Sequence, residues 1–167
     1  MNVLSLCSGI GGIELGIQLV VPTARIVAYV EREAYACTVL AQRMEEGHLD
    51  AAPIFSELES FPAVRYRGKV DCVTAGLPCQ PFSVAGKRQA ERDKRHLWPI
   101  VRPIIEAVEP RFVFLENVSI KAFREPWRDL RAMGFVLPPP YACSAAELGA
   151  GHIRRRVFLF AYRNGGR

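Results

Sequence analysis

The sequence predicts an α/β fold in which a mostly parallel sheet carries helices on both faces. Three observations lead to this prediction. Short apolar runs alternate with segments of helical spacing, and the connections between them are short. The chain has 167 residues, of which 50% are hydrophobic and 23% are charged. That size and composition suit one domain with a single core, so we expect residues 1–167 to form one domain.

The expected strands are short and apolar. Residues 3–6 form an apolar run that ends at glycines, and residues 25–30 are β-branched and apolar. Residues 71–75, 111–115 and 157–161 have the composition of buried strands. Each is too short to be a helix of ordinary length.

The expected helices lie between these runs. Residues 12–20, 34–46, 97–108 and 121–133 have apolar side chains at helical spacing. Gly134 ends the last of them. The three prolines at 138–140 form a turn or stiff connector within the domain, because a strand-like segment follows them closely.

Composition excludes several classes of protein. No apolar run approaches the roughly 20 residues that span a bilayer, and residues 1–4 lack the basic start of a signal peptide. We therefore expect a cytoplasmic protein that does not contact membranes. The five cysteines are odd in number and include no CxxC pair, which argues against a disulfide framework and a metal site.

Positive charge gathers in two places. The formal net charge is 22 − 17 = +5. Residues 87–95 hold five basic side chains against two acids, and residues 152–167 hold five arginines and no acid. Such separated basic patches favour a phosphate-rich partner.

The first strand leads into a glycine turn with the features of a nucleoside site. Gly9, Gly11 and Gly12 allow the backbone to turn sharply and approach a ligand at the start of the next helix. Glu31 follows the second strand, 31 − 11 = 20 residues after Gly11, where a carboxylate accepts hydrogen bonds from ribose hydroxyls in a Rossmann-type domain. The pattern is shorter than a dinucleotide fingerprint, and the Walker lysine is absent. A nucleoside without a pyrophosphate therefore fits at least as well as a dinucleotide.

The third expected strand leads into a candidate nucleophile. Cys79 lies between Pro78 and Pro81, directly after residues 71–75 and at the carboxyl edge where this architecture binds ligands. A thiolate there is a strong nucleophile once positive charge lowers its pKa. Glu116 and Asn117 end the next strand at the same edge. Glu116 is either a helix cap or, beside a nucleophile, a proton donor or substrate anchor whose pKa is raised by desolvation.

These motifs together resemble the DNA (cytosine-5) methyltransferase family, above all its compact prokaryotic and phage members. Leu6 to Gly12, Glu31, Pro78-Cys79-Gln80, Glu116-Asn117-Val118 and Arg154 with Arg156 occur in the family's order. The resemblance implies a Rossmann-like S-adenosylmethionine-dependent methyltransferase fold. It further implies methyl transfer to carbon 5 of cytosine in double-stranded DNA, with the target base flipped out at a cost of a few kcal/mol.

The resemblance also assigns roles to residues. Cys79 attacks carbon 6 of the base, Glu116 holds ring nitrogen 3 and the amino group, and Arg154 and Arg156 complete the catalytic set. The residues implied to contact S-adenosylmethionine are Leu6, Cys7, Ser8, Gly9, Ile10, Gly11, Gly12, Glu31, Arg32, Glu57, Leu58, Pro78 and Leu97. Those implied to contact the substrate are Pro78, Gln80, Ser83, Asn117 and Val118.

The sequence departs from the family pattern in three respects. Cys7 stands where a phenylalanine is common, and His152 stands where a glutamine is common. Family members usually continue past the arginine motif into a target-recognition region, which is absent from these residues. The alternatives are a minimal enzyme of low specificity, one chain of a split enzyme that needs a second chain for target recognition, or a truncated product that binds cofactor or DNA without turnover. RNA is an alternative substrate for the same chemistry.

Overall fold

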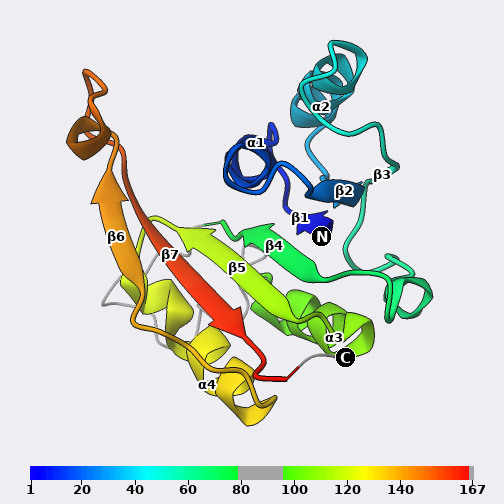
Figure 1. Ribbon diagram of the computed structural model, residues 1–167, viewed down its shortest axis with the longest axis vertical. Helices are drawn as coiled ribbons and strands as arrows, with labels where there is room; N and C mark the ends of the chain where they lie inside the picture. Colours follow the sequence, from blue (N-terminus) through cyan, green and yellow to red (C-terminus); the bar gives the residue numbers. More distant parts are fainter. Residues whose placement is uncertain (79–95, 166–167) are drawn as a thin grey trace.

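One mixed sheet organises the described residues, 1–78 and 96–165, of the computed structural model (Figure 1). Its strand order is β3-β2-β1-β4-β5-β7-β6. The strands are β1 (Asn2–Leu6), β2 (Arg25–Val30), β3 (Ile54–Phe55), β4 (Cys72–Gly76), β5 (Phe112–Asn117), β6 (Tyr141–Ser144) and β7 (Arg155–Tyr162). The first five in sequence run parallel, whereas β7 runs antiparallel to both β5 and β6. The predicted mostly parallel sheet is therefore confirmed.

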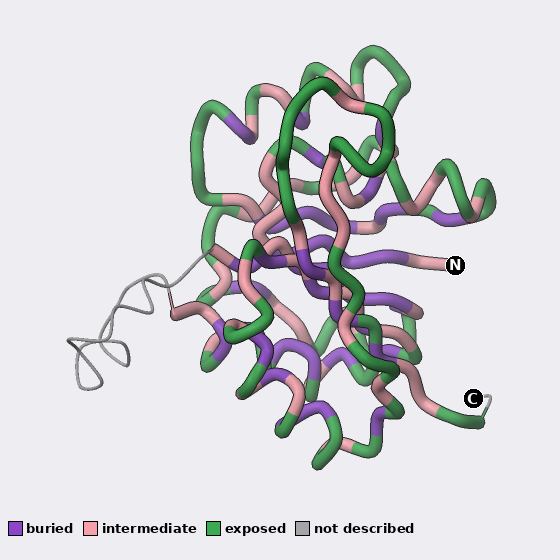
Figure 2. The backbone as a smooth tube through the Cα atoms, turned by 90° about the vertical axis from the view of Figure 1, so that its left-hand side faces the viewer, coloured by how far each residue is buried: buried purple, intermediate pink, exposed green. Residues whose placement is uncertain are grey.

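Helices cover both faces of this sheet, as predicted. Figure 1 shows α1 (Gly12–Val20) and α2 (Ala34–Glu45) on one side, and α3 (Trp98–Val108) and α4 (Arg124–Ala132) on the other. Each face has its own apolar cluster, and alternate residues of β1 divide between them. Val3 packs on the α2 side with Leu40, whereas Leu4 packs on the α3 side with Ile105. Figure 2 shows the resulting buried strands at the centre of the molecule and exposed backbone around them.

The predicted helix over residues 121–133 begins differently from the prediction. The segment starts as a 3₁₀ turn, η3 (Ile120–Phe123), and becomes α-helical only at Arg124. Ser119 caps the turn by accepting a hydrogen bond from the Lys121 N–H at 3.3 Å. Pro126 has no N–H to donate to the carbonyl four residues earlier, so the α-helical ladder does not extend back into residues 120–123.

Several short elements carry too few residues for a periodic pattern. These are the two-residue strand β3 and the 3₁₀ turns η1 (Ala63–Tyr66) and η4 (Ala146–Leu148). β6 is the strand-like segment expected after the three prolines. Within the described ranges, no helix combines the length and apolar character needed to cross a membrane.

Candidate active site

The carboxyl ends of β1, β4 and β5 converge at one edge of the sheet. In register, Leu6 pairs with Ala75, and Gly76 pairs with Glu116. The approach is close: a Cβ built on Gly76 would lie 3.1 Å from the Cys7 carbonyl oxygen and 3.8 Å from Glu116 Oε2. The glycine turn, the segment leading to Cys79 and the Glu116 carboxylate therefore meet, as the sequence predicts.

The glycine turn between β1 and α1 has the backbone geometry that its sequence predicts. Gly9 and Gly11 adopt φ angles of 53° and 81°, in the left-handed region that favours glycine. Gly11 packs against the Leu49 side chain, and a Cβ on Gly11 would lie 2.6 Å from Leu49 Cδ1. A Cβ on Gly9 or Gly12 would meet no atom of the described residues within 4 Å. The turn is therefore open to a ligand at Gly9 and Gly12.

Glu31 ties the end of β2 to this turn. Its carboxylate accepts hydrogen bonds from the Gly9 N–H at 2.7 Å and from the Arg32 and Glu33 N–H groups at 2.8 Å each. A carboxylate offers about four lone pairs, so acceptor capacity remains for a ribose hydroxyl. Glu31 thus fixes the turn and stays available to a nucleoside.

Cys7 lies in the turn with a φ angle of 49°, but its thiol is not a nucleophile. Burial, followed by the nearby Glu31 charge, raises the pKa of Cys7 to about 12. A thiol with that pKa stays protonated at neutral pH. Cys79, the predicted nucleophile, lies outside the described residues.

A buried acid beneath the turn was not predicted. Glu14, in the first turn of α1, is only 1% exposed, and its Oε1 accepts a hydrogen bond from the Thr74 hydroxyl at 2.8 Å. Its Oε2 has no hydrogen-bond partner among residues 1–78 and 96–165. Burial raises the pKa of Glu14, despite hydrogen bonds from Ser5 and Thr74 that lower it. The sequence signal was an acid within a helical segment whose other residues, apart from Gln18, are apolar or glycine.

Glu116 on β5 forms an ion pair with Arg156 on the neighbouring strand β7. Arg156 Nε, at the start of β7, lies 2.6 Å from Glu116 Oε1, and the two side chains are 24% and 20% exposed. Burial raises the pKa of Glu116, while Arg156 and then Arg154 oppose the rise. The predicted desolvation shift is confirmed, and the family's two arginines lie close enough to act on this carboxylate.

Asn117 anchors the segment that leads to the nucleophile. Its buried side-chain amide donates a hydrogen bond to the Leu77 carbonyl at 2.9 Å, and its Oδ1 accepts one from the Ser119 N–H at 3.0 Å. Asn117 therefore fixes the backbone immediately before Pro78. The neighbouring Val118 is 44% exposed at the edge.

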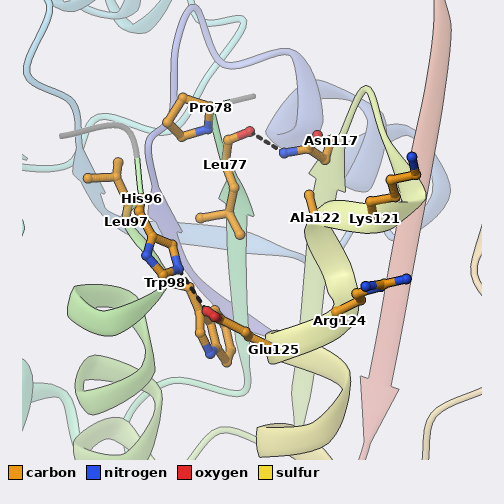
Figure 3. Close-up of a pocket in the computed structure, with 10 residues that line it drawn as sticks. All are labelled: Leu77, Pro78, His96, Leu97, Trp98, Asn117, Lys121, Ala122, Arg124 and Glu125. Atoms are coloured by element: carbon orange, nitrogen blue, oxygen red, sulfur yellow. Dashed lines mark hydrogen bonds and ion pairs between the residues drawn. The ribbon is translucent and has the colours of Figure 1, made fainter. Parts of the chain in front are cut away.

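A cavity of about 190 Å³ opens beside Pro78, on the α3 and α4 side of the sheet (Figure 3). Pro78 and Leu97, predicted to contact the cofactor, line it together with Asn117. His96 and Glu125 form an ion pair at 2.7 Å in its wall. The full lining is Leu77, Pro78, His96, Leu97, Trp98, Asn117, Lys121, Ala122, Arg124 and Glu125. Lys121, Arg124 and the His96–Glu125 pair were missed, because their meeting depends on how α3 and α4 pack.

The remaining predicted site residues are spread more widely over the molecule. Arg32, Glu57 and Arg154 are exposed, and Leu58 packs against the core cluster on the α3 side. Glu57 follows β3, which the strand order separates from β5 by three strands. Gln80 and Ser83, like Cys79, lie outside the described residues.

A metal centre is not formed by the described part of the chain, in which no three His, Cys, Asp or Glu side chains gather as ligands. The described part of the site presents the Glu116 carboxylate, the Arg156 guanidinium and the backbone of the glycine turn.

Comparisons with known proteins agree with this geometry. The family model described as C-5 cytosine-specific DNA methylase matches residues 1–167. The chain is 29% identical to the Type II methyltransferase M.NgoMIV of Neisseria gonorrhoeae, with 96% of the chain aligned to 51% of that protein. It is 30% identical to M.CviJI of Paramecium bursaria Chlorella virus IL3A, with 96% aligned to 42%. The chain thus spans about half the length of these curated relatives.

Solved structures show the same fold. S. pombe Dnmt2 methyltransferase superposes with a TM-score of 0.77 at 23% identity, over 100% of this chain and 52% of that one. A mutant of Spodoptera frugiperda DNMT2 gives 0.76 at 23% identity, over 98% and 50%. The fold is therefore the Rossmann-like methyltransferase fold. Since the family model covers every residue, the chain belongs to the C-5 cytosine-specific DNA methylase family.

Proposed function

We propose that this chain carries the catalytic part of an enzyme that methylates carbon 5 of cytosine in duplex DNA, with S-adenosylmethionine as methyl donor. The observation that carries the proposal is the Glu116–Arg156 pair at 2.6 Å, at the sheet edge beside the segment that leads to Cys79. Burial raises the pKa of Glu116, which favours proton transfer from this carboxyl to a base nitrogen. Family membership supports the same reaction.

The methyl donor fits the glycine turn. The turn is open above Gly9 and Gly12, and Glu31 keeps acceptor capacity for ribose hydroxyls. When bound, S-adenosylmethionine supplies an electrophilic methyl group. We assign the walls of its site to the turn from Leu6 to Gly12, with Arg32, Glu57, Leu58, Pro78 and Leu97 as further contacts.

The base chemistry is assigned to Cys79 and Glu116. The Cys79 thiolate adds to carbon 6, and the electrons of the 5,6 double bond move toward carbon 5, which becomes nucleophilic. Glu116 donates to ring nitrogen 3 and stabilises this adduct, while Arg156 orients Glu116. After methylation, a base removes the carbon 5 proton, the double bond reforms, and Cys79 leaves as thiolate. Gln80, Ser83, Asn117 and Val118 are assigned to contacts with the flipped nucleotide.

The setting of the enzyme is also proposed. The described cysteines, Cys7, Cys37, Cys72 and Cys143, are all unpaired, which is typical of the reducing cytoplasm. The curated relatives are about twice as long as the matched region. We therefore propose that sequence recognition depends on protein outside these residues, in the same polypeptide or in a second chain, and that residues 1–167 form one catalytic domain.

The test is transfer of labelled methyl groups to unmethylated duplex DNA and, in parallel, to RNA of the same sequence. We expect label on DNA cytosine with the wild type and with the matched control Cys143→Ser, and none above background with Cys79→Ala. Glu116→Gln should reduce kcat/KM by about 100-fold or more, because it removes the proton donor. Trapping on 5-fluorocytosine DNA should require Cys79. Transfer by Cys79→Ala, or label on RNA alone, would contradict the proposal.

A further inference from the structure

Four basic side chains share one side of the η3–α4 segment. Lys121, Arg124, Arg128 and Arg131 follow each other at spacings of three, four and three residues, which places them on one helical face. All four are exposed. The opposite face packs into the core through buried Phe123, Pro126 and Leu130. We call these four residues the basic stripe.

The acids of α4 do not cover the basic stripe. Glu125 pairs with His96 at 2.7 Å, in the wall of the cavity. The Asp129 side chain is only 9% exposed and accepts hydrogen bonds from the Trp98 indole at 2.9 Å and from Arg128 Nε at 2.8 Å.

Three members of the stripe therefore keep their charge available to a partner. Lys121, Arg124 and Arg131 have no carboxylate within 4 Å among the described residues. Arg128 shares its charge with the largely buried Asp129. Asp129 is largely buried and Glu125 is paired with His96, whereas the four basic side chains are exposed, so positive charge predominates on the exposed face of α4.

The basic stripe begins at the candidate active site. Lys121 follows Asn117 by four residues and lines the same cavity as Pro78, together with Arg124. Figure 3 shows both basic side chains directed away from the His96–Glu125 pair. Arg124 to Arg131 spans seven residues, roughly 10 Å of helix. That length matches about three nucleotide steps along one strand of duplex DNA.

We infer that the basic stripe binds the sugar-phosphate backbone of the duplex DNA substrate, beside the nucleotide that enters the active site. The inference rests on the proposed function for its substrate. Its four residues are distinct in sequence from the basic runs 87–95 and 152–167. Phosphate contacts position a duplex without reading its sequence, so the stripe contributes affinity that is independent of the recognition site.

The test measures DNA binding without catalysis. Fluorescence anisotropy with labelled duplex is recorded over a salt series in the Cys79→Ala background. The slope of log K against log salt is negative, and each lost phosphate contact should reduce its magnitude by about 0.9. We expect Lys121→Gln/Arg124→Gln to raise the Kd about tenfold and to reduce the magnitude of the slope by nearly 2. Arg131→Gln, farther from the edge, should have the smaller effect.

Two controls separate the stripe from general charge and from folding. Arg65→Gln/Lys69→Gln removes two exposed charges outside the stripe, in the segment that precedes β4, and should leave the Kd within twofold. The exchange Lys121→Arg/Arg124→Lys keeps the charge and should retain binding. S-adenosylmethionine affinity should be unchanged in the Arg131→Gln and Arg65→Gln/Lys69→Gln variants.

Three results would overturn the inference: an unchanged Kd and slope in the Lys121→Gln/Arg124→Gln variant, an equal loss in the Arg65→Gln/Lys69→Gln control, or a loss seen with RNA but not with DNA. Because the assay needs no methyl transfer, the stripe can be supported even where the proposed reaction fails.

Discussion

Two glutamates near the glycine turn have raised pKa values for the same main reason, burial, but their surroundings differ. Glu116 is about 20% exposed and faces Arg156 at the open edge. Glu14 is 1% exposed and contacts the hydroxyl of Thr74, with one oxygen unpartnered. The partly open carboxyl beside a cation suits proton transfer to a substrate. The enclosed one suits holding α1, β1 and β4 together beneath the turn.

The buried Glu14 should make stability depend on pH. Because burial raises its pKa above 4.5 in the folded state, the folded protein keeps this proton to a higher pH than the unfolded chain. The Glu14 contribution to stability is therefore complete below about pH 4.5 and is lost as pH rises through the folded pKa, by about 1.4 kcal/mol per unit of difference.

Glu14→Gln removes this titration. Urea unfolding at pH 5 and pH 8 should show the wild type losing stability relative to Glu14→Gln at the higher pH. The informative quantity is how the stability difference between the wild type and Glu14→Gln changes from pH 5 to pH 8, because glutamine alters the hydrogen bonds at both pH values. A difference that stays the same at pH 5 and pH 8 would contradict a buried, titrating Glu14.

At the scale of elements, the cofactor turn depends on how closely β4 approaches it. A Cβ on Gly76 would lie 3.1 Å from the backbone oxygen of Cys7, so Gly76→Ala must move β4 or the turn by a few tenths of an ångström. We expect S-adenosylmethionine to bind at least about fivefold more weakly, with DNA affinity changed less than twofold. Isothermal titration calorimetry measures the first and anisotropy the second.

Gly16→Ala is the matched control for this change. Gly16 is exposed within α1, and a Cβ there meets no atom within 4 Å. Alanine should stabilise the helix by roughly 0.5–1 kcal/mol without affecting cofactor binding. Wild-type cofactor affinity in Gly76→Ala would show that this approach does not shape the site.

For the whole molecule, the sheet joins the two apolar clusters into one unit. β1 contributes Val3 to one cluster and Leu4 and Leu6 to the other, so neither cluster can come apart without disturbing the central strand. We expect a single cooperative transition in calorimetry, with equal van't Hoff and calorimetric enthalpies. Two separate transitions would contradict the proposed single domain.

Local patterns were enough to predict most elements and the order of the motifs. The expected helix over residues 12–20 and strand over residues 25–30 agree with α1 and β2 to the residue. The glycine turn, Glu31 and Glu116 were also found, because carboxyl ends of parallel strands share an edge whatever their order. Hydrophobic periodicity and turn-forming residues depend on only a few neighbouring positions, so they can be read directly from the sequence.

Tertiary structure alone decided which distant residues meet. The insertion of β7 between β5 and β6 brings Arg156 to Glu116 across 40 residues of sequence. The packing of α1 against the sheet buries Glu14, and the packing of α3 against α4 buries Asp129 beside Trp98 while the basic side chains of α4 stay exposed. Strand order and helix packing are set by the summed burial of side chains far apart in the sequence, which no local pattern records. The sequence by itself determined the elements, the motifs and the edge at which they act, whereas the ion pair, the buried acid and the basic stripe exist only through long-range packing.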